Sequence, residues 1–404
     1  MSSINLKKNI VVTILSKSLI LLLNFAVVVL TTRLWGADGR GAVAIFVADL
    51  SLLSIFANVF TGSSVSYFFS RFASSKLATA AYLWSFVVAT AGALVLLACG
   101  RMTEAPFLFA AVSLMGLIAF HNSVFIGDQK IDYYNLLTVL QPALLLLCML
   151  VCQCLWPQLG YYGYFFGQTL SLLLMLLVCG ILRRKMQLRL RWDFDGQCNR
   201  QMLSFGWKTE LSSLLQFFNY RLTYYLLAYF ISRGSVGIFS IGVTVAEAIW
   251  IVSRSVSMVQ FSNVLKQGNT MQSRKETMSL ALVSLGISAA CILVVLLLPA
   301  SLFAFVFGPE FGEVKRVVLL LAPGILAIAF SNVLGNYFSA IRQLNILIVK
   351  SFVGLVFTLV LAIWLIPKWQ IDGACVVNAA SYLMSSAVLL WYYLSKKTVV
   401  DCHE

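Results

Sequence analysis

Charged residues are scarce in this chain of 404 residues. Asp, Glu, Lys and Arg together make up 11% of it, and 60% is hydrophobic. A soluble domain usually carries about 25% charged residues. The polar outer surface that a soluble protein needs cannot be built from what remains. The composition therefore excludes a soluble globular domain and predicts a surface that faces lipid.

The residues and motifs of common enzyme chemistry are also missing. The chain has two histidines and nine cysteines, and no two cysteines have the CxxC spacing. No phosphate-binding GxxxxGK[ST] loop, GxSxG elbow or HExxH motif occurs. We therefore expect no structural disulfide, no metal site, no cofactor and no enzyme activity. A basic stripe interleaved with aromatics on a soluble domain is absent as well, so we expect no nucleic-acid partner.

Long apolar stretches fill the chain almost from end to end. A spanning helix needs roughly 20 apolar residues, and these runs are too long and too uniform for the alternating strands of a membrane barrel. The sequence predicts an all-α polytopic membrane protein. Its twelve expected helices are 10–32, 42–68, 78–99, 106–125, 133–155, 161–182, 203–229, 236–262, 278–306, 315–340, 344–366 and 371–395.

The distribution of basic residues predicts the orientation. The chain carries 29 Lys and Arg against 15 Asp and Glu. With both termini in the cytoplasm, most of the basic residues outside the helices fall on the cytoplasmic side, as positive-inside topology requires. Lys7 and Lys8 precede a long first helix without an early cleavage site, so we expect that helix to be retained. We expect a multi-pass membrane protein with both termini in the cytoplasm.

A weak internal repeat divides the chain in two. The segment Leu155-Trp156-Pro157 followed by Gly163 resembles Leu365-Ile366-Pro367 followed by Gly373. A second pair joins Arg40–Phe46 to Arg233–Phe239. The order of the matches predicts two parallel six-helix lobes. The expected lobes are 1–182 and 203–404, and residues 183–202 form a basic cytoplasmic linker that either touches anionic headgroups or binds a partner.

Several segments together resemble one known family. They are Thr32–Gly41, Thr61–Phe68, Arg221–Leu227 with Val236–Glu247, Phe307-Gly308-Pro309-Glu310-Phe311 with Leu319–Gly324, and Leu365–Ala374. In order and spacing they are similar to Wzx-type oligosaccharide flippases of the multidrug/oligosaccharidyl-lipid/polysaccharide (MOP) exporter superfamily. Thr223 departs from the family pattern, which often has an acid there, and Phe261-Ser262 lacks the usual proline.

The resemblance implies two lobes around a central cavity and a transport activity. The substrate would be an undecaprenyl-pyrophosphate-linked oligosaccharide, moved from the cytoplasmic to the periplasmic leaflet by alternating access. The product would enter a surface polysaccharide, either the O-antigen of lipopolysaccharide or a capsule-like polymer. Membrane lipid is an implied partner, and a polysaccharide polymerase and a chain-length regulator are candidate partners. Two rival functions stay open: a cation-coupled drug or metabolite exporter of the same superfamily, and a non-transporting component of a polysaccharide assembly complex.

Ionisable residues inside the expected helices mark the candidate site. A charge at the bilayer centre costs on the order of 2.5–3.5 kcal/mol on insertion scales, so such a group must face protein, water or a ligand. Because the first and seventh helices are equivalent in the two lobes, Lys17 and Arg221 are expected to line the cleft, where they would attract a pyrophosphate. The expected substrate-binding residues are Lys17, Asn24, Arg221, Arg254 and Lys350, and the candidates for ion coupling or charge pairing are Asp49, Glu210 and Glu247.

Plainer roles remain open for the same residues. Arg254 and Lys350 have long side chains that reach toward the membrane interface in many proteins. The sequence spacing places Glu210 on the same helix face as Arg221, and Glu247 on the same face as Arg254, so each pair could be purely structural. Asp49 fits either ion coupling or helix packing.

Overall fold

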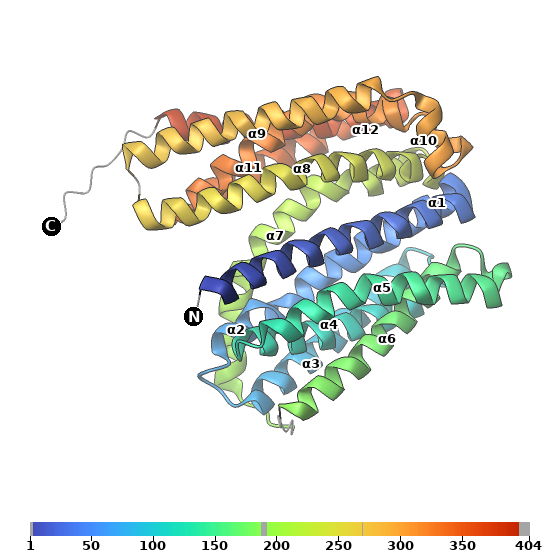
Figure 1. Cartoon of the computed structure of the whole chain (residues 1–404). Helices are drawn as coiled ribbons and strands as arrows, with labels where there is room; N and C mark the ends of the chain where they lie inside the picture. The colour runs from blue at the N-terminus through green and yellow to red at the C-terminus, as the bar shows by residue number, and fades with distance from the viewer. Residues whose placement is uncertain (1–2, 187–191, 269, 396–404) are drawn as a thin grey trace. The chain divides into compact units, whose positions relative to one another are not determined.

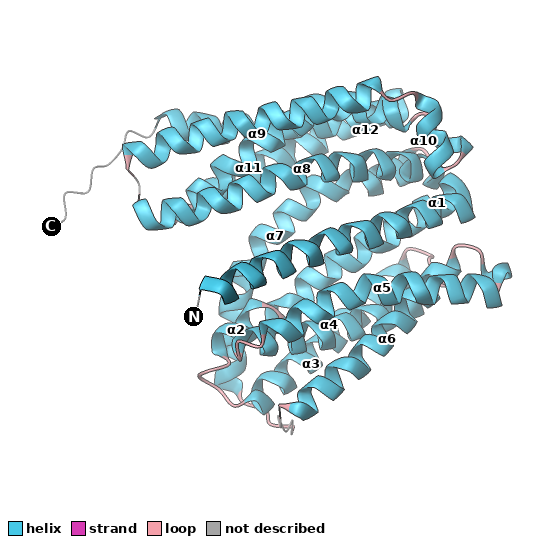
Figure 2. Cartoon of the chain, viewed as in Figure 1, coloured by secondary structure: helices cyan, strands magenta, loops and turns pink. Residues whose placement is uncertain are grey.

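We describe a computed structural model of the chain for residues 3–186, 192–268 and 270–395. In these ranges every regular element is a helix and no strand occurs, which confirms the all-α prediction (Figure 2). By residue contacts the described chain divides into two compact units. Unit 1 holds the residues up to Trp35 together with Ile45–Leu214, and unit 2 holds Gly36–Ala44 together with the residues from Leu215 onward.

Unit 1 is a bundle of α-helices with short connections. Within it α4 packs against α2, α3, α5 and α6, so α4 is the central element (Figure 1). The aromatic and aliphatic side chains of α4 are buried on several sides, as expected for a helix that is apolar all round. The helices are α1 (Ser3–Thr61), α2 (Ser63–Phe68), α3 (Ser74–Ala98), α4 (Ala105–Gly127), α5 (Ile131–Leu155), the short 3₁₀ helix η1 (Pro157–Leu159) and α6 (Tyr162–Lys185).

Helix α1 is broken at Gly36, where the chain turns back on itself (Figure 1). Gly36 has φ +63° and ψ −163°, a conformation that a side chain would strain. The apolar part of this region, Leu19–Phe68, has 50 residues. A straight helix of that length would measure about 75 Å, more than twice the roughly 30 Å hydrocarbon core. The break therefore separates α1 into two arms. The first corresponds to the predicted span 10–32, and the second, together with α2, corresponds to 42–68.

In unit 2 the central element is α11, which packs against α8, α9 and α12. Gly324 on α11 lets α12 approach closely, because a Cβ there would lie 2.7 Å from the Cα atom of Ala379. The unit contains the C-terminal part of α7 (Gly196–Phe230), then α8 (Arg233–Gln267), α9 (Met271–Leu297), α10 (Ala300–Phe307), the 3₁₀ helix η2 (Pro309–Phe311), α11 (Val314–Ala340) and α12 (Leu344–Ser395).

Helix α12 is a hairpin of two arms. The break falls at Gln370 (φ +50°, ψ −123°), shortly after Pro367. Hydroxyl groups join the arms: Ser381 Oγ donates to the carbonyl of Gly354 at 2.8 Å, and Thr358 Oγ1 donates to Ser381 Oγ at 2.9 Å. The arms correspond to the predicted spans 344–366 and 371–395, and the residues between them adopt the turn.

The outer helices show the reverse of a soluble amphipathic pattern. The buried stripe of α9 is made mainly of small and hydroxyl-bearing residues, Ser273, Thr277, Ala281, Ser284 and Ser288. Large apolar side chains on the same helix are exposed, as Leu297 is at 85%. Small residues let helices pack closely in lipid, where apolar surface gains nothing from being hidden. This pattern is that of a helix with one side toward lipid.

Nine helices among the described residues are long and apolar enough to cross a membrane. Two of the nine, the regions of α1 and α12, are the kinked elements that each hold two predicted spans. The predicted span 203–229 lies in α7, which is longer and more polar and is not among the nine. The predicted span 278–306 is divided between α9 and α10 by Pro299, which occupies the N-cap of α10. The chain is a multi-pass membrane protein.

The repeat motifs occupy matching places. Leu155-Trp156-Pro157 ends α5 and begins η1, and Gly163 opens α6. Leu365-Ile366-Pro367 precedes the break in α12, and Gly373 follows it. In the expected linker, residues 187–191 lie outside the described part of the chain. The C-terminal part of the expected linker is attached to α3 in unit 1, because Asp195 accepts a hydrogen bond from Lys76 Nζ at 2.7 Å.

Candidate functional site

Arg221 forms an ion pair with Glu247 inside unit 2. Its Nη2 lies 2.9 Å from Glu247 Oε1, and its Nη1 donates to Tyr224 Oη at 2.6 Å. The guanidinium carbon also lies 5.0 Å from the centre of the Tyr224 ring, in cation–π geometry. The pair joins α7 to α8. The structure thus pairs Arg221 with Glu247, rather than joining Glu247 to Arg254 along one helix.

Three aromatic rings lie beside this pair. The centroids of Tyr220, Trp250 and Tyr382 are between 5.7 and 5.8 Å apart in every combination. Gln216 Nε2 donates to Tyr220 Oη at 3.2 Å. These rings come from α7, α8 and α12, so one aromatic cluster holds three helices of unit 2 together next to the charged pair.

Lys350 lies on the first arm of α12 in a small cavity of about 20 Å³. The lining is neutral: it contains Gln216, Asn219, Tyr220, Ile328, Ser331, Ser351, Tyr382 and Ser385. Among the described residues no carboxylate contacts the Lys350 amine. The backbone beside it is held firmly, because Asn219 Nδ2 donates to the carbonyl of Ser351 at 2.7 Å.

The aromatic cluster connects the two groups, since Tyr220 and Tyr382 line the Lys350 cavity and also belong to the ring cluster next to Arg221. Counting Arg221, Glu247 and Lys350, this region carries two positive charges and one negative charge. We call these three residues the unit 2 cluster. A surplus cation in an apolar bundle is costly unless it meets water or an anion. The unit 2 cluster therefore has one positive charge that water or an anion has to satisfy.

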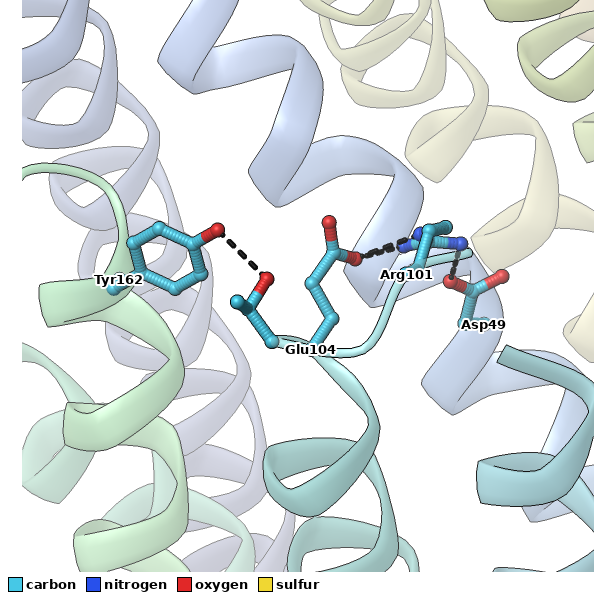
Figure 3. A network of polar contacts seen from close by, with 5 residues as sticks. Asp49, Arg101, Glu104 and Tyr162 are labelled. Carbon is cyan, nitrogen blue, oxygen red and sulfur yellow. Dashed lines mark hydrogen bonds and ion pairs between the residues drawn. The ribbon is translucent and has the colours of Figure 1, made fainter. Parts of the chain in front are cut away.

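Unit 1 contains a different ionic arrangement, which we call the unit 1 triad: Asp49, Arg101 and Glu104 (Figure 3). Arg101 Nη1 donates to Asp49 Oδ2 at 2.8 Å, and Arg101 Nε donates to Glu104 Oε2 at 2.9 Å. Both carboxylates are buried, with Asp49 8% and Glu104 3% exposed. Thr103 in the same loop pairs with Tyr162 Oη at 2.9 Å. The triad fixes the α3–α4 loop onto α1.

Arg101 is held in its charged form. Burial by itself would lower the pKa of its guanidinium, but the adjacent Asp49 and Glu104 more than offset this, and the pKa lies above its ordinary value. Asp49 also borders an apolar groove of about 420 Å³ between α1 and α3, but its carboxylate is engaged by Arg101. These contacts support a packing role for Asp49, one of the two roles that the sequence left open.

The remaining predicted residues lie apart from these groups. Asn24 is exposed on α1, and Arg254 is exposed on α8. Glu210 is half-buried on the part of α7 that belongs to unit 1. Lys17 lies in α1, but its side chain is outside the described part of the chain. Thr223, where the family pattern often has an acid, is buried and donates a hydrogen bond to Asn378 Oδ1.

Two residues near the break in α1, Glu310 and Arg40, make contacts for which the sequence predicted no role. The backbone N–H of Ala37 donates to Glu310 Oε2 at 2.6 Å, so this carboxylate caps the helix that restarts after Gly36. Arg40 is buried and its Nε donates to Ser240 Oγ at 3.3 Å. The available signal was the Gly308-Pro309-Glu310 motif, in which a lone acid follows two helix-breaking residues.

Solved transporter structures share this fold. A multidrug resistance MATE family transporter of the MOP superfamily, solved in an inward-facing conformation, matches with a TM-score of 0.74 at 13% identity, covering 95% of this chain and 97% of that one. The lipid II flippase MurJ matches with a TM-score of 0.77 at 12% identity, covering 95% and 87%. The Vibrio cholerae MATE transporter VcmN, solved as a point mutant, matches with a TM-score of 0.62 at 13% identity, covering 95% and 93%.

At these identities the matches establish the fold, which this chain shares with the MATE transporters and with MurJ. None of the curated proteins matches this chain. A family model described as "Polysaccharide biosynthesis protein" matches residues 6–261, which is more than half of the chain. Family and fold agree with the resemblance seen in the sequence. The chain belongs to the polysaccharide biosynthesis protein family, and its fold is similar to those of a MATE transporter and of MurJ.

Proposed function

We propose that this protein is a flippase for an undecaprenyl-pyrophosphate-linked oligosaccharide. It moves the lipid-linked repeat unit from the cytoplasmic to the periplasmic leaflet of the bacterial inner membrane, where the unit enters O-antigen or a capsule-like polymer. The observation that carries the proposal is the surplus positive charge of the unit 2 cluster, in which Lys350 lies in a cavity without a carboxylate. A pyrophosphate is an anion that an arginine and a lysine bind well.

Family and fold support the same reading. The matched family is one of polysaccharide biosynthesis, and one solved protein of this fold is a flippase for lipid II. In the proposal, two lobes (1–182 and 203–404, joined by the linker 183–202) open alternately to the two sides, with both termini in the cytoplasm. Lys17, Asn24 and Arg254 are further proposed contacts of the substrate. A polysaccharide polymerase and a chain-length regulator are proposed partners.

The rival reading as a cation-coupled drug exporter is less well supported. A cationic cargo or coupling ion needs an accessible carboxylate. Asp49 and Glu104 bind Arg101, and Glu247 binds Arg221. Among the described residues, Asp49, Glu104 and Glu247 are thus engaged by arginine and half-buried Glu210 is not. No acid in the same part of the chain engages Lys350.

The test is a leaflet assay in a strain that lacks the gene. We expect lipid-linked repeat units to accumulate on the cytoplasmic leaflet, and the wild-type gene to restore export. Arg221→Ala should abolish export at unchanged membrane abundance, and Arg221→Lys should retain part of it, because Lys keeps the charge but loses the bidentate geometry.

Two results would count against the proposal. Accumulation of the units on the periplasmic leaflet in the deletion strain would place the protein after translocation and support a role in polymer assembly. Normal export by the Arg221→Ala variant would remove Arg221 from the substrate site.

A further inference from the structure

A second cavity, of about 200 Å³, lies inside unit 1 between α1, α4, α5 and α6. Its polar lining consists of Ser54 and Asn58 on α1, Asn122 on α4 and Gln141 on α5. Its apolar lining includes Met115, Ile118 and Leu172. None of these residues belongs to the unit 2 cluster or to the other proposed substrate contacts. We call this space the amide cavity.

No charged residue is found among the described residues that line the amide cavity. Its polar groups are three carboxamides and a hydroxyl, each of which offers both hydrogen-bond donors and acceptors. The Oδ1 atom of Asn122 is buried and accepts no hydrogen bond within the described residues. A buried acceptor without a partner is unusual in a native protein. Asn58 is held in place at one end, because its Oδ1 accepts a hydrogen bond from Thr61 at 3.3 Å.

The lining selects among ligand classes. A phosphate would call for a cationic side chain and a metal cation for carboxylates, and neither type lines the cavity. A lipid chain would call for an apolar surface. The groove of about 420 Å³ between α1 and α3, lined by residues such as Leu52, Phe56 and Val87, has that character. The amide cavity differs from the groove in carrying polar groups on three of its four helices.

We propose that the amide cavity binds one uncharged sugar ring of the transported substrate. Sugar hydroxyls would pair with Asn58, Asn122 and Gln141, and the C–H face of the ring would pack on the apolar lining. The volume is below the roughly 300–1,000 Å³ typical of pockets for drug-sized ligands, which suits a single ring and not a whole oligosaccharide. This inference rests on the proposed function and adds to it the substrate class that unit 1 recognises.

The experiment uses the full-length protein in phosphatidylcholine nanodiscs. Saturation-transfer NMR is recorded with uncharged monosaccharides (galactose, rhamnose and N-acetylglucosamine) at millimolar concentration. We expect transfer to at least one of them, and we expect Asn122→Leu and Gln141→Leu each to weaken it about fivefold or more, as for a lost hydrogen bond to a buried group. Two variants on different helices guard against a local folding defect in either one.

The matched control is Ser113→Ala. Ser113 is also on α4 and buried, and its Oγ is also without a partner among the described residues, but it does not line the cavity. This variant should bind sugar as the wild type does. Absence of transfer to the wild type, or equal transfer to all variants, would overturn the inference and leave the amide cavity as a water-filled space.

A parallel arm separates this inference from the flippase proposal. Inorganic pyrophosphate is titrated calorimetrically into the same samples. Its binding should be lost in Lys350→Met and unchanged in Asn122→Leu. Sugar binding without any pyrophosphate binding would contradict the flippase proposal and leave the sugar site standing. Pyrophosphate binding without sugar binding would do the reverse.

Discussion

The two ionic groups of this protein differ in balance and in what surrounds them. In the unit 1 triad a single arginine satisfies two buried carboxylates and ties a loop to a helix. In the unit 2 cluster one carboxylate serves Arg221, while Lys350 lies among neutral side chains. Internal partners complete the triad, whereas the cluster has a positive charge that an external anion can satisfy. The difference shows that a charged side chain inside the bundle indicates a binding site only when its oppositely charged partners within the protein do not balance it.

The largest expected effect is on the triad. Arg101→Met leaves Asp49 and Glu104 buried without a counter-charge, which should lower the free energy of unfolding by about 3 kcal/mol. Denaturation in detergent and membrane abundance measure it, and export per folded molecule should be retained. As a control, the triple change Asp49→Asn, Arg101→Met and Glu104→Gln should recover most of the stability. A stable Arg101→Met variant that fails to export would assign the triad to transport.

The second effect separates the cluster from the triad. Lys350→Met removes a cation that has no carboxylate partner among the described residues, so stability should be unchanged or higher. Export should fall about tenfold to a hundredfold, equivalent to the roughly 1.5–3 kcal/mol of a hydrogen bond to a charged group. Lys350→Arg should restore part of the activity. Wild-type export by Lys350→Met, measured at equal abundance, would contradict the proposed role.

A third test asks whether packing, rather than charge, distinguishes the two units. A Cβ at Gly206 in unit 1 would lie 1.9 Å from the carbonyl oxygen of Val59, and one at Gly237 in unit 2 would lie 2.0 Å from that of Ala37. Both alanine variants should lose about 1–3 kcal/mol because backbone has to move. Gly180→Ala, where nothing lies within 4 Å, is the control and should be neutral or stabilising. Unequal losses at Gly206 and Gly237 would show that the units also differ in packing.

The smallest effect concerns the half-buried pair of Lys76 and Asp195 in unit 1. The hydrogen bond from Lys76, with those from the backbone of Cys198 and Gln197, holds the pKa of Asp195 below its ordinary value. The stabilisation is therefore complete above the pKa that Asp195 has when unfolded, and it is lost as the pH falls through the lower folded value. Melting temperatures between pH 7 and pH 3 should decline less for Asp195→Asn. Parallel curves for the variant and the wild type would show that this pair contributes nothing.

The sequence predicted the helices well because their cause is local. Runs of apolar residues determine the spans. The regions of Gly36 and Pro367 indicated where α1 and α12, each too long for one span, have to break. The division of the predicted span 278–306 was missed, although Pro299 lies within it. Proline limits its own φ and the preceding residue, so it could have been used as the signal.

The partners of the charged residues could not be predicted in the same way. Spacing along one helix suggested that Glu210 could pair with Arg221 and Glu247 with Arg254, but Arg221 reaches across to Glu247 on the next helix. Such contacts depend on how α7 and α8 pack, and a single sequence does not carry that information. The pairing of Arg101 with Asp49 was missed for the same reason, because Asp49 lies on a different element. Glu104 is only three residues from Arg101, and that local pairing could have been predicted.

The hairpin of α12 has a mechanical consequence for the proposed site. Ser385 Oγ donates to the carbonyl of Lys350 at 3.4 Å, and Ser381 Oγ donates to that of Gly354, so the first arm is fastened to the second along its length. Tyr382 lies on the second arm, next to both serines. Because these bonds couple the two arms, we expect any movement of Lys350 along the membrane normal to move Tyr382 as well.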